Sequence, residues 1–298
     1  MPHPDLHRHL DGSLRVATLA ELAAHLGLRV PADLPFAPGM GLMAALSRFA
    51  FTLSTLQRPE AVRRVAAECA EDALLEGVDP FELRFAPQLH RGAAPEEIVD
   101  AALDGLAGRG GLLLCGLYGE PPTVLDQLVA IAATRPGVLG IDLAGGPAAG
   151  HRFGLRDYAP AFTRARDLGI GRTVHAGEGR PAAEIGEAIV HLHAQRIGHG
   201  TTLLEDPTVL DQVLEGGITI EACPTSNWHT GVISAVEAHP LPRWLALGVR
   251  VCVNADNTLL SGVTAADELR TMAALPGVGA AGVARLIEYG RAAAFRRA

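Results

Sequence analysis

The sequence predicts an α/β protein built as a (β/α)8 TIM-type barrel. Short apolar runs alternate with helical patterns along most of its 298 residues, and strands that alternate with helices indicate a parallel sheet. Eight such units in a chain of about 300 residues match the eightfold barrel. A doubly wound open sheet is the alternative, but no glycine-rich dinucleotide or phosphate fingerprint follows the first strand, which weakens it.

The first quarter of the chain contains one strand and three helices. The strand includes Asp5 and ends in His7-Arg8-His9, just before Gly12. Apolar residues at helical spacing and Pro or Gly at the boundaries give the remaining elements. They are helices over 13–27, 42–56 and 59–75, with a loop rich in Pro and Gly over 31–41. We expect 31–57 to be an elaboration over the barrel mouth.

From residue 78 onward, strands and helices follow one another regularly. The expected strands cover 78–85, 112–117, 138–143, 171–174, 196–198, 218–222 and 249–253. The expected helices cover 95–106, 123–133, 182–192 and 206–214. Two further helices end at 168, after a loop over 144–156, and near 247, after a loop that follows the seventh strand. Helices are also expected over most of the chain beyond 253. No composition break or low-complexity segment interrupts this order, so we expect a single domain over 1–298.

Composition excludes several function classes. The formal net charge is −8 and there is no long basic run, so neither nucleic acid nor an anionic membrane is the expected partner. The four cysteines form no CxxC pair, which is typical of reduced, buried thiols. The polar N-terminus and the lack of an apolar run of about 18 residues predict no signal peptide and no membrane span, hence a cytoplasmic protein.

A candidate metal site emerges from the strand ends. His7 and His9 lie at i and i+2, so on a strand both imidazoles project from the same face. His175 ends the fifth strand and Asp256 follows the eighth, and in a barrel such positions meet at one mouth. Three imidazoles and one carboxylate suit Zn²⁺ better than Fe²⁺ or Mn²⁺. The other close histidine pair, His191 and His193, falls on a helix end, where the two side chains diverge.

Eight stretches together resemble the metal-dependent adenosine deaminase family, within the larger group of amidohydrolase-like barrels. They occur in the family's order and span nearly the whole chain. The stretches are His7-Arg8-His9-Leu10-Asp11-Gly12-Ser13, Glu82-Leu83-Arg84-Phe85-Ala86-Pro87, Gly140-Ile141-Asp142-Leu143-Ala144-Gly145, His175-Ala176-Gly177-Glu178, Arg196-Ile197-Gly198-His199-Gly200, Cys223-Pro224-Thr225-Ser226-Asn227, His239-Pro240 and Asn254-Ala255-Asp256.

The resemblance implies hydrolytic removal of an amino group from an aminopurine nucleoside, with one zinc ion held by the four residues above. It implies that His199 orients and helps to deprotonate the attacking water, and that Glu178 protonates the ring nitrogen beside the attacked carbon. It also implies substrate contacts from the Gly145 backbone and from Asp11, although Asp11 could instead cap the following helix. Glu221 and Ser226 are either supports for the imidazoles or ordinary hydrogen-bonding residues of the mouth.

Two departures from the family pattern concern the substrate. Many members have a second aspartate after the metal-binding one, where this chain has Asn257, and an acidic pair where it has Gly146 and Pro147. An amide still donates a hydrogen bond to a purine nitrogen. Adenosine or 2'-deoxyadenosine is therefore the expected substrate, with a modified adenine nucleoside (aminodeoxyfutalosine, methylthioadenosine) or adenine as alternatives. A less favoured reading is a different metal-dependent hydrolase, although the chain has no lysine to form a carboxylated bridge.

Overall fold

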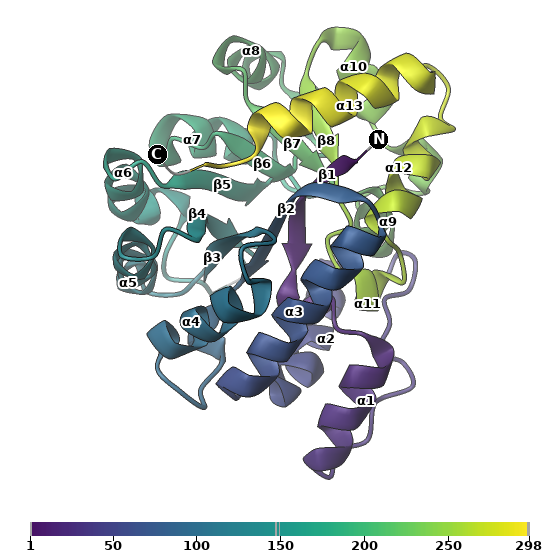
Figure 1. Ribbon diagram of the computed structural model, residues 1–298. Coiled ribbons are helices and arrows are strands. Elements are labelled where there is room, and N and C mark those ends of the chain that lie inside the picture. The colour runs from purple at the N-terminus through teal and green to yellow at the C-terminus, as the bar shows by residue number, and fades with distance from the viewer. Residues whose placement is uncertain (1, 147, 149, 297–298) are drawn as a thin grey trace.

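Eight parallel strands form one sheet whose spatial order is the chain order, as Figure 1 shows for the computed structural model. The structure describes residues 2–146, 148 and 150–296. The strands are β1 (His3–His9), β2 (Val78–Phe85), β3 (Gly111–Leu117), β4 (Val138–Ala144), β5 (Gly171–Ala176), β6 (Arg196–His199), β7 (Thr219–Ala222) and β8 (Arg250–Val253).

Helices follow the strands and cover the sheet from outside. They are α1 (Val16–His25), α2 (Leu42–Thr55), α3 (Pro59–Leu75), α4 (Pro95–Leu106), α5 (Pro122–Ala133), α6 (Ala159–Asp167), α7 (Ala183–Leu192), α8 (Pro207–Gly216), α9 (Pro224–His229), α10 (Leu241–Leu247), α11 (Thr258–Ser261), α12 (Ala265–Ala273) and α13 (Gly279–Ala293). Their apolar faces pack with the outward side chains of the strands into one continuous core, which is how a parallel sheet buries its surface.

Local chemistry explains where the helices begin and end. Pro59 opens α3, where its missing N–H costs nothing. Gly77, with φ of 76°, then turns the chain into β2. The Asp206 side chain accepts hydrogen bonds from the first N–H groups of α8, and Gly217 follows that helix in the left-handed conformation that glycine adopts most readily.

The barrel closes through residues just beyond β8 rather than through β8 itself. The His9 N–H donates to the Asp256 carbonyl over 2.8 Å, and the Asp256 N–H donates to the His7 carbonyl over 2.9 Å. The Leu6 N–H also donates to Asn254 Oδ1 over 2.8 Å. The first and last strands are thereby joined, which confirms the predicted TIM-type barrel.

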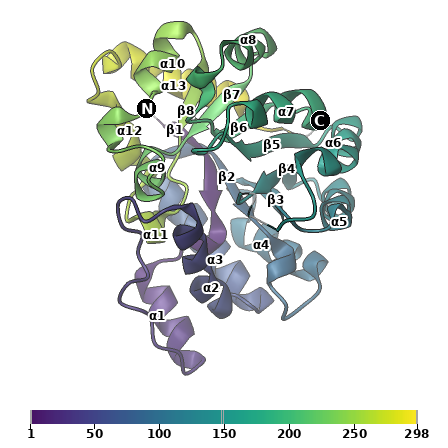
Figure 2. The same cartoon turned by 180° about the vertical axis from the view of Figure 1, so that it is seen from behind.

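The two ends of the barrel are covered differently. In Figures 1 and 2, α1, α2 and α11 gather around the lower end, toward which β1 runs, whereas α13 crosses the opposite end. Side chains from the loop before α2 and from α2 itself lie against the strand ends, which confirms that part of 31–57 covers the mouth.

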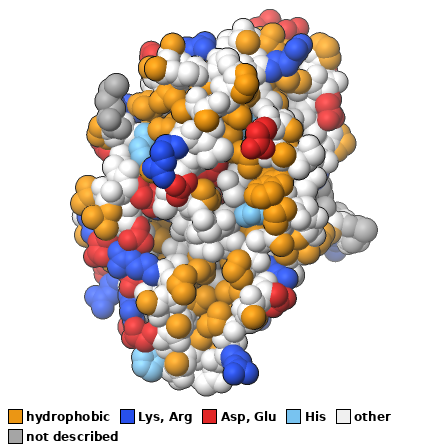
Figure 3. Space-filling view, turned by 90° about the vertical axis from the view of Figure 1, so that its right-hand side faces the viewer, with side chains coloured by type: hydrophobic (Ala, Val, Ile, Leu, Met, Phe, Trp, Pro, Cys, Tyr) orange, Lys and Arg blue, Asp and Glu red, His pale blue; other side chains and the backbone are white. Residues whose placement is uncertain are grey.

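The surface is mixed in charge. On the face drawn in Figure 3, several basic side chains lie beside acidic ones. Among the described residues, no helix is both long enough and apolar enough to cross a membrane. The four cysteines are free and buried, as their spacing predicted. The single domain over 1–298 stays a prediction.

Most predicted elements are present, with shifts of a few residues at their ends. The helix expected from residue 13 begins at Val16, because Leu10–Gly12 forms a short 3-10 turn first. The segment after β7 was expected to begin as a loop, but Pro224–His229 forms α9. Pro147 lies outside the described residues.

Candidate active site

Four side chains meet at the mouth of the barrel. His9 Nε2 lies 3.3 Å from His175 Nε2, and Asp256 Oδ1 lies 3.6 Å from His7 Nε2 and 3.4 Å from His9 Nε2. All four residues predicted as metal ligands are thus together.

The spacing of these donor atoms suits a zinc ion. Tetrahedral zinc with bonds of about 2.0–2.1 Å sets neighbouring donors about 3.3 Å apart, close to the separations in the cluster. The buried His7 Nε2 has no hydrogen-bond partner among the described residues. Burial lowers the pKa of His7 and of His9 well below the usual range, with further repulsion from Arg84 and neighbouring imidazoles. Neutral rings of this kind can donate a lone pair to a metal.

Local backbone geometry aims these groups. Alternation along β1 turns His7 and His9 to the same side, and His175 stands near the end of β5. Asp256 has φ of 59° and His199 has φ of 66°. Left-handed backbone is costly for residues other than glycine, and such strain concentrates at functional sites. For Asp256, the two hydrogen bonds that close the barrel stabilise this conformation.

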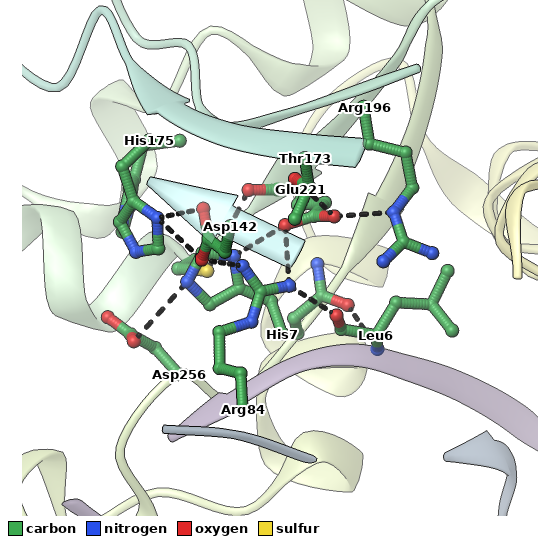
Figure 4. Close-up of polar contacts among 12 residues, drawn as sticks. Leu6, His7, Arg84, Asp142, Thr173, His175, Arg196, Glu221 and Asp256 are labelled. Atoms are coloured by element: carbon green, nitrogen blue, oxygen red, sulfur yellow. Dashed lines mark hydrogen bonds and ion pairs between the residues drawn. The ribbon is translucent and has the colours of Figure 1, made fainter. Parts of the chain in front are cut away.

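Buried carboxylates hold the imidazoles from behind, as Figure 4 shows. Glu221 Oε2 lies 2.7 Å from His7 Nδ1, and Asp142 Oδ2 lies 3.0 Å from His175 Nδ1. A carboxylate on the second ring nitrogen fixes the tautomer and makes the first nitrogen a better ligand. Burial raises the pKa of Asp256, and the Ser226 side chain acts in the opposite direction.

Arg84 links these two carboxylates. Its guanidinium lies 2.8 Å from Asp142 Oδ2 and 2.9 Å from Glu221 Oε2 (Figure 4). Burial acts to raise the pKa of Asp142, but His175 and Arg84 outweigh it, so the pKa is lowered and the carboxylate stays ionised. Burial acts to lower the pKa of His175, but Asp142 outweighs it and the pKa is raised.

Glu178 and His199 stand together beside the cluster. Glu178 Oε2 lies 3.8 Å from His199 Nε2, and both side chains are buried. Burial raises the pKa of Glu178 to about 7, with a further contribution from Asp256. Burial also lowers the pKa of His199 well below its usual range. A carboxyl group that keeps a proton near neutral pH and a neutral imidazole can serve as an acid and a base.

Two cavities meet at this point. A small one of about 50 Å³ touches His9, His175, Glu178, His199 and Asp256. A larger one of about 370 Å³ shares His9 with it and continues toward the ends of β2, β3 and β4. Apolar side chains dominate the larger cavity. They are Met43, Leu46, Phe49, Ala50, Leu53, Ala86, Leu89, Leu117, Ala144 and Ala148.

The predicted substrate contacts border these cavities. Asp11 lines the larger one and Asn257 the smaller, while Gly145 lies at both. Burial raises the pKa of Asp11 to about 7, and its Oδ1 has no partner among the described residues. Asp11 does not cap α1, whose N-cap is Arg15. Asn257 Oδ1 packs against Gly12, where an added Cβ would lie 1.9 Å from that oxygen.

Sequence reasoning missed several residues of the site. Asp142 and Arg84 fell within recognised stretches but were given no role. The same signal that selected Asp256, an acidic group after an apolar strand, could have selected Asp142. Asn227, whose side-chain amide is hydrogen-bonded to His199 Nδ1 over 3.0 Å, gave no separate signal. Phe36 and Phe49, which line the small cavity, are indistinguishable in sequence from core aromatics.

An eight-stranded barrel with this cluster at its mouth is typical of amidohydrolase-like enzymes, which hydrolyse C–N and related bonds. The family model described as adenosine deaminase matches residues 2–298. An adenosine deaminase of Serratia proteamaculans is 35% identical over 316 residues, an alignment that covers 99% of this chain and 94% of that protein. The chain therefore belongs to the adenosine deaminase family, whose enzymes remove amino groups from purines by hydrolysis.

Solved structures agree on the fold while differing in substrate. The adenine deaminase of Arthrobacter aurescens has a TM-score of 0.89 and 25% identity, covering 99% of this chain and 94% of that one. The Arabidopsis N6-mAMP deaminase MAPDA also has a TM-score of 0.89 and 25% identity, covering 100% and 94%. Neighbours of equal similarity thus carry the names of different purine substrates.

Proposed function

We propose that this protein catalyses the zinc-dependent hydrolytic deamination of a 6-aminopurine nucleoside. The substrate would be adenosine or 2'-deoxyadenosine, and the products inosine or deoxyinosine and ammonia. One observation carries the proposal: a buried carboxyl group with a pKa of about 7 lies beside a neutral imidazole at a cluster of three histidines and an aspartate.

His7, His9, His175 and Asp256 would hold the zinc ion, with His7 and His175 oriented by Glu221 and Asp142. Bound there, zinc would act as a Lewis acid toward a water molecule. Ser226, whose side chain favours the ionised form of Asp256, would support this set. The donor spacing and the unpartnered His7 Nε2 support this assignment.

His199 and Glu178 divide the proton transfers. The Asn227 amide nitrogen lies 3.0 Å from His199 Nδ1, and the amide oxygen has no partner among the described residues. With the two amide positions exchanged, that oxygen accepts from Nδ1–H, and Nε2 of the neutral His199 ring is free to accept a proton from the attacking water. Glu178, still protonated near neutral pH, donates its proton to the ring nitrogen beside the attacked carbon. That donation stabilises the charge that develops when attack breaks the aromaticity of the ring.

Three residues would position the substrate. Gly145 has φ of 75° and places no side chain between its backbone and the cavity, so the backbone can approach the purine. The Asn257 amide would bond the five-membered ring of the purine, and Asp11 the 5' end of the sugar. The unpartnered Oδ1 of Asp11 supports a hydroxyl donor from the substrate.

The lining of the cavities favours a nucleoside over a nucleotide. Among the described residues that line either cavity, none is an arginine, and the chain contains no lysine. A 5'-phosphate would therefore meet apolar side chains and Asp11 instead of the cations that phosphate sites use. This argues against AMP or N6-methyl-AMP as the substrate.

A second candidate is an adenine nucleoside with an apolar 5' substituent. The apolar cavity of about 370 Å³ beyond Asp11 favours this alternative, because it exceeds what a sugar hydroxyl needs. Adenine itself is a further alternative, in line with the neighbouring adenine deaminase. A cytoplasmic location is part of this proposal.

A substrate panel tests the proposal. Zinc-loaded protein is assayed for release of ammonia from adenosine, 2'-deoxyadenosine, methylthioadenosine, adenine and AMP, and for release of methylamine from N6-methyl-AMP. We expect the highest kcat/KM for one of the three nucleosides. Higher kcat/KM for AMP than for any nucleoside would contradict the argument from the cavity lining, and no release from any of the six would refute the proposed substrate class.

A further inference from the structure

A cavity of about 700 Å³ opens on the face of the barrel opposite the candidate active site. It is bounded by the first residues of β5 to β8 and by the end of α13 and the residues after it. In Figure 1 the end of α13 reaches the region of β5 and β6. Small-molecule sites typically enclose about 300–1,000 Å³, so this recess has the size of a ligand site.

Positive charge dominates its lining. The described lining residues include five arginines, namely Arg166, Arg172, Arg196, Arg250 and Arg296, and one acidic residue, Glu288. Arg196 is neutralised by Glu82 and Glu221 at 2.5 and 2.6 Å, and Arg166 by Asp167 at 2.9 Å. Arg172, Arg250 and Arg296 have no ion pair among the described residues, so the cavity retains excess positive charge.

Arg172 differs from every other buried arginine of the described chain. Arg8, Arg84 and Arg196 each pair with at least one carboxylate. Arg172, only 9% exposed, bonds only carbonyl oxygens, with Nε on His193 and Nη1 on Ile170, both at 2.8 Å. Its Nη2 has no partner among the described residues.

A buried cation without a counter-charge is costly. Burial lowers the pKa of Arg172 and repulsion from Arg166 lowers it further, while attraction to Asp167 offsets these effects only in part. The two carbonyl contacts hold the guanidinium in place, so an anion in the cavity would meet a donor that is already oriented. Arg250, which lies against Gly217, adds a second guanidinium at the rim.

We propose that this cavity binds a small phosphorylated anion, either a phosphate ester or a polyphosphate. Arginine guanidinium groups match the oxygens of a phosphate group, and several of them suit a ligand that carries more than one negative charge. The recess is enclosed by four strand ends and a helix, which favours a small molecule over the flat surface of a protein partner. The site lies away from the mouth and does not depend on the deaminase proposal.

Calorimetric titration of the zinc-loaded protein tests this site. The probes are inorganic phosphate, tripolyphosphate and ATP, with adenosine as a ligand for the mouth. We expect saturable binding of tripolyphosphate or ATP that weakens with added salt. Comparison of the two separates a polyphosphate from a phosphate ester of a nucleoside. No saturable binding of any of the three phosphate probes would overturn the proposal.

Three arginine variants and one control locate the site. Arg250→Gln and Arg296→Gln change exposed side chains, so both should fold, and each should weaken binding about tenfold, as expected for one charge-assisted contact. Arg172→Gln should weaken it more. Arg243→Gln alters an exposed arginine of α10 outside the cavity and should leave binding unchanged. Binding that is unaltered in both Arg250→Gln and Arg296→Gln would overturn the proposal, even if Arg172→Gln failed to fold.

Discussion

Replacing Glu178 by Gln is the most direct test of the proposed chemistry. Gln has nearly the same shape and still donates hydrogen bonds, but it has no proton to transfer. General acid catalysis contributes about 10²–10⁴ to a rate, so kcat should fall by that factor, or by about 3–5 kcal/mol at 1.36 kcal/mol for each factor of ten. The side chain is buried beside His199, so bulk water cannot readily replace it as a donor.

The pH dependence follows from the raised pKa of the same group. Burial raises the pKa of Glu178 to about 7, so the protonated form is present below that value and is lost above it. The protonated fraction falls from about 0.9 at pH 6 to about 0.1 at pH 8, so kcat/KM should fall about tenfold over this interval. A bound dication lowers the pKa of Glu178, which would centre the fall of kcat/KM below pH 7 and make it larger than tenfold between pH 6 and pH 8.

The assay is ammonia release across pH 5 to 9, with zinc content measured on every sample. Glu187→Gln, which changes an exposed carboxylate of α7 paired with Arg156, is the matched control and should behave as the parent. A Glu178→Gln protein with full zinc and a kcat within tenfold of the parent would refute the role of proton donor. A fall of kcat/KM at alkaline pH that is the same in Glu178→Gln as in the parent would also refute this role.

Three further predictions concern stability, metal and substrate. Burial raises the pKa of Glu268 to about 8, against 4.5 for an ordinary glutamate. The native state therefore holds a proton that the unfolded chain loses, and stability falls as pH rises through this window. The variant Glu268→Gln keeps an oxygen for the Thr225 N–H. In urea titrations, its free energy of unfolding relative to that of the parent should rise by up to about 5 kcal/mol between pH 4.5 and pH 8. A difference that does not change with pH would contradict this. Removing zinc with a chelator should lower the melting temperature. The free energy of unfolding should fall by about 4 kcal/mol if the free zinc concentration before removal was a thousand times its Kd. An unchanged melting temperature would count against the metal site. Asn257→Asp should change the ranking of substrates by kcat/KM, because it replaces a donor amide by a carboxyl beside the purine; an unaltered ranking would show that this position does not select the substrate.

The order of elements could be predicted because each depends on local chemistry. β2, α3 and α4 have the predicted bounds, since an apolar run or a Pro and Gly boundary defines each of them. Pro224–His229 was missed as a helix because one and a half turns leave no periodic pattern. Convergence of the strand ends at one mouth then followed from the barrel alone, and it brought His7, His9, His175 and Asp256 together.

Contacts across the barrel could not be predicted, because they depend on which distant side chains share the interior. Asp142 and Glu221 are 79 positions apart, and Arg84 bridges them. Arg8 lies outside the barrel interior, because alternation between His7 and His9 turns its side chain away from the barrel axis, and the strand pattern does not identify its partners. The structure supplies Asp5 at 2.8 Å and Glu76 at 3.0 Å, with the guanidinium over the Phe81 ring.

The pair of hydrogen bonds between Asp256 and the backbone of His7 and His9 has a consequence for how the protein matures. The seam that closes the barrel contains three of the four residues of the candidate metal cluster, two from the first strand and one from the far end of the chain. A chain emerging from the ribosome carries His7 and His9 early, but it must complete seven more strands before Asp256 arrives. The full candidate set therefore exists only when the barrel is closed, so loading of a metal ion there would report on completed folding. A truncated or stalled chain could retain histidines without the geometry that makes them a site.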